Sequence, residues 1–293
     1  MKPPPFQYHD PKTLAEAVGL LGKLDNAKLL AGGQSLMPML NMRFVLPDHV
    51  IDLNLVEGMS GIKEASGALE IGAMTRQRDL EFSDLVKAKC PLLHQAIMHI
   101  GHRQTRNRGT IGGSLCHLDP AAELVSVAAA HDATVVVAGQ NGTREIAFKD
   151  FPAGYLTPAI ELNEIVTTIR IPLWPAGHKA TFVEFSRRHG DFAIVSAAAL
   201  LQIEGGKIAR ASVTVGGVAV APVRASDVEQ AITGQAPASA LFAKACESCR
   251  SIDAMADIHA SADYRQHLAA VLSRRALEKA AGLADNAPWN RAH

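Results

Sequence analysis

Two glycine-rich segments carry residue types that could bind a phosphate. The first is Leu29-Leu30-Ala31-Gly32-Gly33-Gln34-Ser35, and the second is Gly109-Thr110-Ile111-Gly112-Gly113-Ser114. Glycine has no Cβ, so consecutive backbone amides can turn toward one anion and the chain can approach it closely. A hydroxyl ends each segment and can donate to a phosphate oxygen. Two such segments facing each other could hold both phosphates of a diphosphate.

Each segment also has a simpler interpretation, because paired glycines commonly mark tight turns. Neither segment has the glycine spacing of the Rossmann fingerprint, and no acidic residue follows a second strand at the expected place. From residue types and spacing alone, the sequence therefore indicates a phosphate-bearing ligand or a pair of turns.

Cysteine and histidine spacings suggest two further chemistries. Cys246-x-x-Cys249 could indicate redox or metal chemistry. It lies in an alanine-rich helical segment without a second pair, and full zinc or iron–sulfur ligation needs about four ligands, so we predict a structural pair. His94, His99 and His102 are interpreted as helix-face residues, and we expect no metal site. Without a Gly-x-Ser-x-Gly element, serine-hydrolase chemistry has no support.

The N-terminal half contains the elements that would position both glycine segments. Thr13-Leu14-Ala15-Glu16 is a capping box that predicts a helix start. Thr75 is a predicted helix N-cap, and Asp119 is predicted to cap a helix with Pro120 in its first turn. The other predicted elements are strands at 27–31, 50–53 and 69–73, a helical turn at 36–42, a helix at 91–100, a basic loop at 103–114, a hairpin at 135–148 and a strand at 164–171.

A stretch rich in proline and glycine, residues 172–177, predicts a domain boundary. We expect a first domain at 1–175, with subdomains near 1–55 and 56–175, and a second domain at 176–293. The second domain has a predicted hairpin and helices at 226–232, 238–249 and 264–281. Strands and helices in segregated groups predict an α+β fold, with a small antiparallel sheet and helices in the C-terminal domain.

Composition excludes several functional classes. The chain has 293 residues, 29 Lys plus Arg and 29 Asp plus Glu, and so a net charge of zero. Such a balance provides no global attraction to nucleic acid or an anionic membrane. The N-terminus has no apolar signal region, and no apolar run is long enough to span a bilayer. We therefore expect a cytoplasmic protein with its cysteines reduced.

The order and separation of the glycine segments resemble one known family. The sequence is similar, over nearly its whole length, to the FAD-binding medium subunits of molybdenum hydroxylases, which include the carbon monoxide dehydrogenase medium subunit and the flavin domain of xanthine dehydrogenase. The matching positions are Phe6, Pro11, Leu14, Glu16 and Ala17, then residues 28–36, 106–114, 119–123 and 164–172, and finally Arg187, Arg188, Gly190, Asp191, Phe192 and Ala193.

This resemblance implies the FAD-binding fold of vanillyl-alcohol oxidase and a non-covalently bound FAD. It implies that residues 31–35 and 110–114 grip the pyrophosphate. Glu123 stands where the family often has Asp near the flavin, and Ser114 replaces a common Asn. The cofactor-binding residues implied are Leu29, Leu30, Ala31, Gly32, Gly33, Gln34, Ser35, Leu36, Thr110, Ile111, Gly112, Gly113, Ser114, His117, Asp119 and Glu123.

The family also implies an electron-transfer subunit with no catalytic side chain of its own. A large molybdopterin-binding subunit would hydroxylate the substrate, and a small subunit with 2Fe–2S clusters would pass electrons to this FAD. The flavin would discharge to an external acceptor, within a complex expected to be a dimer of heterotrimers. Arg103, Arg106 and Arg108 could orient the diphosphate loop, dock an acidic partner or form a solvated charged turn. Arg187, Arg188 and Asp191 could contact the flavin ring, dock a partner or form an ion-paired surface turn.

Two alternative functions remain open from the sequence. The first is a stand-alone FAD-dependent reductase similar to UDP-N-acetylenolpyruvoylglucosamine reductase. That function requires a proton-donating Ser and a carboxylate over the flavin, and no such pair is identifiable. The second is a non-catalytic nucleotide-binding assembly module.

Overall fold

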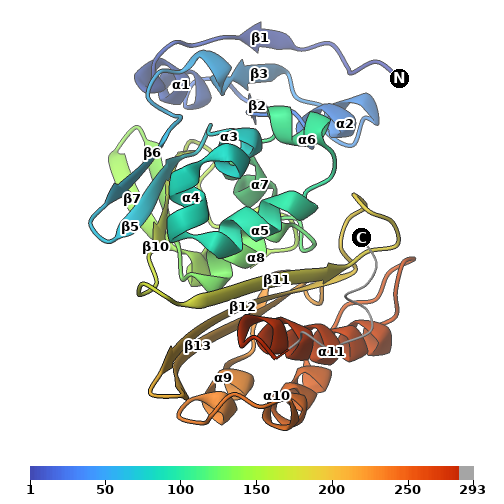
Figure 1. The fold of residues 1–293 in the computed structure, drawn as a ribbon. Coiled ribbons are helices and arrows are strands. Elements are labelled where there is room, and N and C mark those ends of the chain that lie inside the picture. Colours follow the sequence, from blue (N-terminus) through green and yellow to red (C-terminus); the bar gives the residue numbers. More distant parts are fainter. Residues whose placement is uncertain (284–293) are drawn as a thin grey trace. The chain divides into compact units, whose positions relative to one another are not determined.

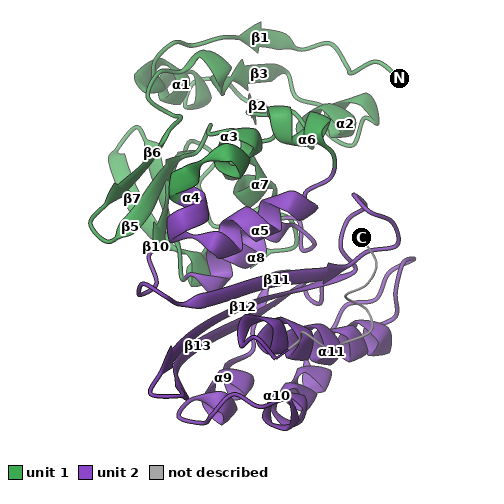
Figure 2. Cartoon of the chain, viewed as in Figure 1, with its two compact units in different colours: residues 1–85, 102–118, 132–172 green, residues 86–101, 119–131, 173–293 purple. Residues whose placement is uncertain are grey.

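The computed structural model describes residues 1–283 (Figure 1). The chain divides into two compact units, each built from separate stretches of sequence (Figure 2). Unit 1 comprises residues 1–85, 102–118 and 132–172, and unit 2 comprises residues 86–101, 119–131 and the chain from 173 onward. The helices at 91–99 and 123–130 thus pack with the C-terminal part of the sequence. Within residues 1–283, no helix has the length and apolarity needed to cross a membrane.

Unit 1 begins with a three-stranded parallel sheet in the order β1-β3-β2. The predicted capping box is confirmed, since the Thr13 side chain accepts from the Glu16 amide and the Glu16 carboxylate accepts from the Thr13 amide. The elements of this sheet and its helices are β1 (Gln7–His9), α1 (Leu14–Leu21), β2 (Ala27–Leu30), α2 (Leu36–Asn41), β3 (His49–Asp52) and the short helix η1 (Leu53–Leu55).

A second sheet of unit 1 has five antiparallel strands in the order β4-β5-β10-β6-β7. Its central strand, β10, buries Ile165, Ile169 and Ile171. The strands are β4 (Ile62–Ala65), β5 (Ala68–Gly72), β6 (Thr134–Gly139), β7 (Gly142–Ala147) and β10 (Ile165–Pro172). The other elements are α3 (Gln77–Phe82), α6 (Arg103–Arg108), α7 (Ile111–His117), η2 (Phe148–Asp150), β8 (Pro152–Gly154) and β9 (Thr157–Pro158), while α4 (Asp84–Lys89) crosses into unit 2.

Two local predictions for this region are wrong. Residues 103–108 form helix α6 instead of a loop. Its Arg106 is buried and donates to Glu81 at 2.8 Å, a distant partner that the local sequence does not reveal. Thr75 caps no helix, because its hydroxyl bonds the backbone of Gly61 and leaves Arg76 as the N-cap of α3.

Unit 2 is organised around a four-stranded antiparallel sheet in the order β11-β12-β13-β14. Consecutive residues of strand β12 are buried from Val195 onward. Since successive side chains point to opposite sides of a sheet, both faces of this strand are covered. Gly205 and Gly206, both with positive φ, form the predicted turn between β12 and β13. The strands are β11 (Lys179–Phe185), β12 (Val195–Glu204), β13 (Lys207–Gly216) and β14 (Val223–Arg224), and the helices are α5 (Pro91–His99), α8 (Glu123–Ala130), α9 (Ser226–Ile232), α10 (Ser239–Cys246), η3 (Glu247–Ser251) and α11 (Ala262–Ala280).

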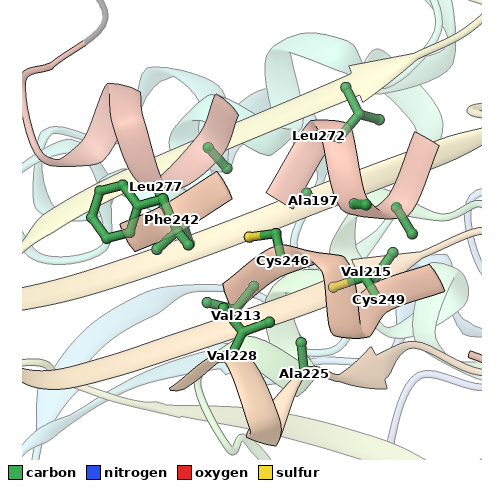
Figure 3. Packing of buried hydrophobic residues seen from close by; sticks show 14 of the residues in the cluster. Ala197, Val213, Val215, Ala225, Val228, Phe242, Cys246, Cys249, Leu272 and Leu277 are labelled. Atoms are coloured by element: carbon green, nitrogen blue, oxygen red, sulfur yellow. The ribbon is translucent and has the colours of Figure 1, made fainter. Parts of the chain in front are cut away.

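The Cys246 and Cys249 thiols lie in the apolar core of unit 2. Figure 3 shows both side chains among Val213, Val215 and Leu272, and each cysteine is almost fully buried. Burial raises the pKa of both thiols, which keeps them protonated and unreactive. This environment supports the prediction of a structural pair.

Replacing Cys246 by serine is expected to lower the free energy of unfolding by about 1–3 kcal/mol, since a hydroxyl would be buried in an apolar core. The FAD affinity and electron transfer that the family resemblance implies should be unchanged. Urea unfolding and flavin titration of the variant measure the two effects separately. Cys246→Ala is the apolar control. Lost electron transfer at normal stability would contradict a structural role.

Candidate functional site

The first glycine turn, residues 31–35, joins β2 to α2 in unit 1. Gly33 has φ +74°, a conformation that glycine adopts at little cost. Among residues 1–283, no protein acceptor bonds the backbone amides of Gly33, Gln34, Ser35 or Leu36. The Ser35 side chain also makes no capping bond to α2. This turn therefore presents a run of free donors, as expected for an anion-binding turn.

The second glycine turn, residues 109–114, precedes and begins α7 in unit 1. Most of its amides already have protein acceptors: Ile111 donates to the Thr75 carbonyl at 3.2 Å and Gly112 to the Ala73 carbonyl at 2.9 Å. Gly113 donates to Oγ1 of the N-cap Thr110 at 3.0 Å. The expectation that amides of both segments point toward an anion is thus corrected for this turn.

The glycines of the second turn instead allow close packing. A Cβ at Gly112 would lie 2.6 Å from Cβ of Ala73. Within the described chain, the Thr110 amide and the Ser114 hydroxyl remain without a protein acceptor. Thr110 is almost fully buried, so the Ser114 hydroxyl is the donor that this turn can offer to a ligand.

The two glycine turns lie against each other. A Cβ at Gly32 would approach the Arg108 carbonyl oxygen to 2.2 Å, and one at Gly113 would lie 3.5 Å from Cβ of Ala31. The chain thus brings residues 31–35 and 109–114 together, although they are far apart in sequence. A surface with donors from both turns suits an extended ligand carrying a diphosphate.

The flanking predicted residues divide between the two units. Leu29, Leu30 and Leu36 are partly buried beside the first turn, and His117 is the last residue of α7. Asp119 and Glu123 belong to unit 2. Asp119 does not cap a helix as predicted: its Oδ1 accepts from the Ala121 amide at 2.8 Å in a turn, and α8 begins only at Glu123.

Glu123 is a partly buried carboxyl in the first turn of α8. Burial, together with the nearby carboxylates of Glu184 and Asp119, raises the pKa of Glu123 to about 8. Its side chain therefore holds a proton at neutral pH and can donate a hydrogen bond.

Replacing Glu123 by glutamine should remove a pH dependence of stability. The folded chain keeps the Glu123 proton to about pH 8, whereas the ordinary pKa is 4.5. The stability due to the neutral carboxyl is present below pH 4.5 and is lost as pH rises to 8. The free energy of unfolding of Glu123→Gln, relative to that of the wild type, should therefore rise with pH by up to about 1.4 kcal/mol per pH unit. Urea unfolding between these pH values measures the difference; a profile parallel to that of exposed Glu57→Gln would contradict it.

The structure separates the predicted arginine groups. Arg106 is buried against Glu81, whereas Arg103 and Arg108 are exposed. In the turn at 186–191, the Ser186 hydroxyl donates to the Arg188 carbonyl at 2.9 Å. Within residues 1–283, Arg187, Arg188 and Asp191 form no ion pair, so the ion-paired form of this turn is not observed.

Sequence reasoning missed two polar residues beside the glycine turns, Asn54 and Arg76. Asn54 Nδ2 donates to the Ala31 carbonyl at 3.0 Å. The guanidinium of Arg76 donates to the Arg108 carbonyl and to Oδ1 of Asn54. A usable signal for Asn54 is its place just after β3, since β3 is parallel to the strand that ends in the first turn.

Comparison with known families agrees with this arrangement. Residues 4–174 match the family described as the FAD binding domain in molybdopterin dehydrogenase, and residues 180–280 match the CO dehydrogenase flavoprotein C-terminal domain. The chain belongs to this family of flavoprotein subunits. Its members are the FAD-binding medium subunits of molybdenum hydroxylases, which are oxidoreductases.

Similar proteins span nearly the full length of the chain. The 6-hydroxypseudooxynicotine dehydrogenase complex subunit alpha of Paenarthrobacter nicotinovorans is 38% identical, over 96% of both chains. The carbon monoxide dehydrogenase medium chain of Afipia carboxidovorans is 37% identical, over 98% of this chain and 100% of the relative. A solved structure of reconstituted CO dehydrogenase from Oligotropha carboxidovorans matches with a TM-score of 0.94 and 37% identity, over 97% of this chain and 100% of the other. The predicted fold class is thereby confirmed.

Proposed function

We propose that this chain transfers electrons within a molybdenum hydroxylase, from iron–sulfur clusters of a partner subunit to an external acceptor. The observation that carries the proposal is the ordered match of both flavoprotein domains, at 4–174 and 180–280. Two glycine turns packed together within the first of these regions support it. No feature of the structure favours the stand-alone reductase or the assembly module.

The residues of the first turn fit an FAD diphosphate. Free amides from Gly33 to Leu36 would donate to phosphate oxygens, and the hydroxyls of Ser35 and Ser114 would add donors. We extend the proposal to all of the predicted cofactor-binding residues, and to 1–175 as the FAD-binding domain. Bound FAD supplies the electron chemistry, while the protein provides binding and orientation. This function requires no general acid or base from the chain.

The proposed assembly contains a large molybdopterin-binding subunit and a small subunit with 2Fe–2S clusters, as a dimer of heterotrimers. Relatives named as a complex subunit and a medium chain support a multi-subunit enzyme. Exposed Arg187 and Arg188 are candidate contacts with a partner subunit. Such contacts would weaken with ionic strength.

Purification from the native source tests this proposal. A tag on this chain should recover a large molybdenum-containing subunit and a small iron–sulfur subunit in equal amounts, together with FAD. Double substitution Arg187→Glu/Arg188→Glu should weaken recovery if this turn docks a partner, while Lys149→Glu, an exposed change elsewhere, should not. A flavin-containing chain recovered alone at low salt would contradict the complex.

A further inference from the structure

We propose that Arg76 and Asn54 form a clamp that sets the spacing of the two glycine turns and thereby selects a ligand with a diphosphate. The inference rests on the FAD site proposed above and adds two positioning residues to it. Neither residue lies in a glycine turn, and both lie in unit 1 with the turns.

Asn54 is the half of the clamp that holds the first turn. Its Nδ2 donates to the Ala31 carbonyl at 3.0 Å, immediately before the paired glycines. The backbone amide of Asn54 donates to Oδ1 of Asp52 at 2.9 Å, and Oδ2 of Asp52 accepts from the Tyr8 hydroxyl at 2.7 Å. The Asn54 side chain is therefore held in place by strands β1 and β3 before any ligand binds.

Arg76 is the half that holds the second turn. Its backbone pairs with Thr110 in an isolated antiparallel bridge, next to a bond from the Gln77 amide to the Gly109 carbonyl at 2.8 Å. Its guanidinium donates two hydrogen bonds, from Nη1 to the Arg108 carbonyl and from Nη2 to Oδ1 of Asn54. One guanidinium thus links the first turn, through Asn54, to Arg108, the residue immediately before the second turn.

The chemistry of this link favours arginine. A planar guanidinium can bond two acceptors at once in fixed directions, which a lysine ammonium does not do. Burial and the neighbouring Arg108 cation lower the pKa of Arg76. The Arg76 and Arg108 cations, close enough to repel each other, favour an anionic ligand beside them.

The spacing of the two glycine turns matters because the turns pack closely together. There is no room for a Cβ between Gly32 and the Arg108 carbonyl, so the clamp holds the two turns in a close approach. A diphosphate can meet the donors of both turns, whereas a monophosphate can be satisfied by the first turn alone. Loss of the clamp should therefore weaken diphosphate ligands more than monophosphate ligands.

The test compares ADP with AMP, and FAD with FMN, on the full chain freed of flavin. The wild type should prefer ADP to AMP and FAD to FMN. In Arg76→Gln, affinity for FAD and ADP should fall by roughly 10-fold or more, as expected for losing charge-assisted bonds. Affinity for AMP and FMN should change by less than about 3-fold. Arg76→Lys should fail to restore the preference, because one ammonium cannot span both acceptors.

Two further variants make the test specific. Arg78→Gln removes an exposed arginine from the same helix, whose Nη1 contacts Asn107 rather than a turn, and it should leave every affinity unchanged. Asn54→Ala should reproduce the loss of preference for diphosphate over monophosphate ligands. It therefore tests the clamp even if Arg76→Gln does not fold. Because the link between the turns needs both residues, the double variant should lose little more than Arg76→Gln alone.

The outcomes separate the clamp from the site. Equal weakening of ADP and AMP in Arg76→Gln and Asn54→Ala would show general structural damage and overturn the proposal, as would unchanged FAD affinity. If Gly33→Val abolishes FAD binding while both clamp variants retain the ADP preference, the site stands and the clamp is wrong. If Gly33→Val binds FAD normally, the glycine-turn site itself is wrong.

Discussion

FAD affinity is expected to fall by at least roughly 100-fold when Gly33 is replaced by valine. Gly33 has φ +74°, a region that a β-branched side chain avoids. A Cβ there would also lie 3.2 Å from Cγ of Met37 and 3.4 Å from Cδ1 of Leu30. The turn must therefore rotate, and the free amides that follow Gly33 lose their common direction. Titration of the flavin-free chain with FAD measures the loss.

A matched control separates backbone strain from loss of the site. Gly58 in unit 1 has φ +76°, and a Cβ at that position meets no atom within 4 Å. Gly58→Val therefore introduces the same strain away from the glycine turns, and it should keep normal FAD affinity. Full flavin content in Gly33→Val, or equal losses in both variants, would contradict binding at the first turn.

Valine at Gly113 should also impair FAD binding, but through a different contact. A Cβ at this position would lie 2.8 Å from Oγ1 of Thr110, which caps α7 through the Gly113 amide. The same Cβ would extend toward Ala31 of the first turn. Sequence reasoning identified this glycine from its motif, whereas the structure shows that it permits the two turns to approach.

Local signals were sufficient where a structure depends on neighbouring residues. The capping box at Thr13 and the paired glycines between β12 and β13 are such cases. Both are decided by hydrogen bonds or φ angles within a few residues. The helix at residues 226–232 was also predicted with its observed bounds.

Long-range partners explain what the sequence did not reveal. Arg106 of helix α6 meets Glu81, and amides of the second turn donate to the carbonyls of Ala73 and Thr75. Asn54 likewise meets Ala31 only because β3 lies beside β2. Spacing along the chain gives no information on which distant carbonyl a donor will find, so the candidate residues were predictable but their individual contacts were not.

Arg265, in the first turns of α11, is the residue of unit 2 whose loss should be most damaging. Its guanidinium is almost fully buried. Nη1 donates to the carbonyls of Ile194 at 2.5 Å and Gly217 at 2.7 Å, and Nη2 donates to Oδ2 of Asp257 at 2.7 Å. One side chain thus joins the start of β12, the end of β13 and the segment before α11.

Replacing Arg265 by methionine is expected to lower the stability of unit 2 by roughly 2–5 kcal/mol, because two carbonyls each lose a charged hydrogen-bond donor. The methionine fills much of the space but leaves two carbonyls and a carboxylate without their donor. Hydrogen exchange of the β12 amides and urea unfolding should both report the loss. Arg250→Met, which removes an exposed ion pair with Glu247, should cost less than about 1 kcal/mol. If the two variants are equally stable, the buried guanidinium does not hold these segments together.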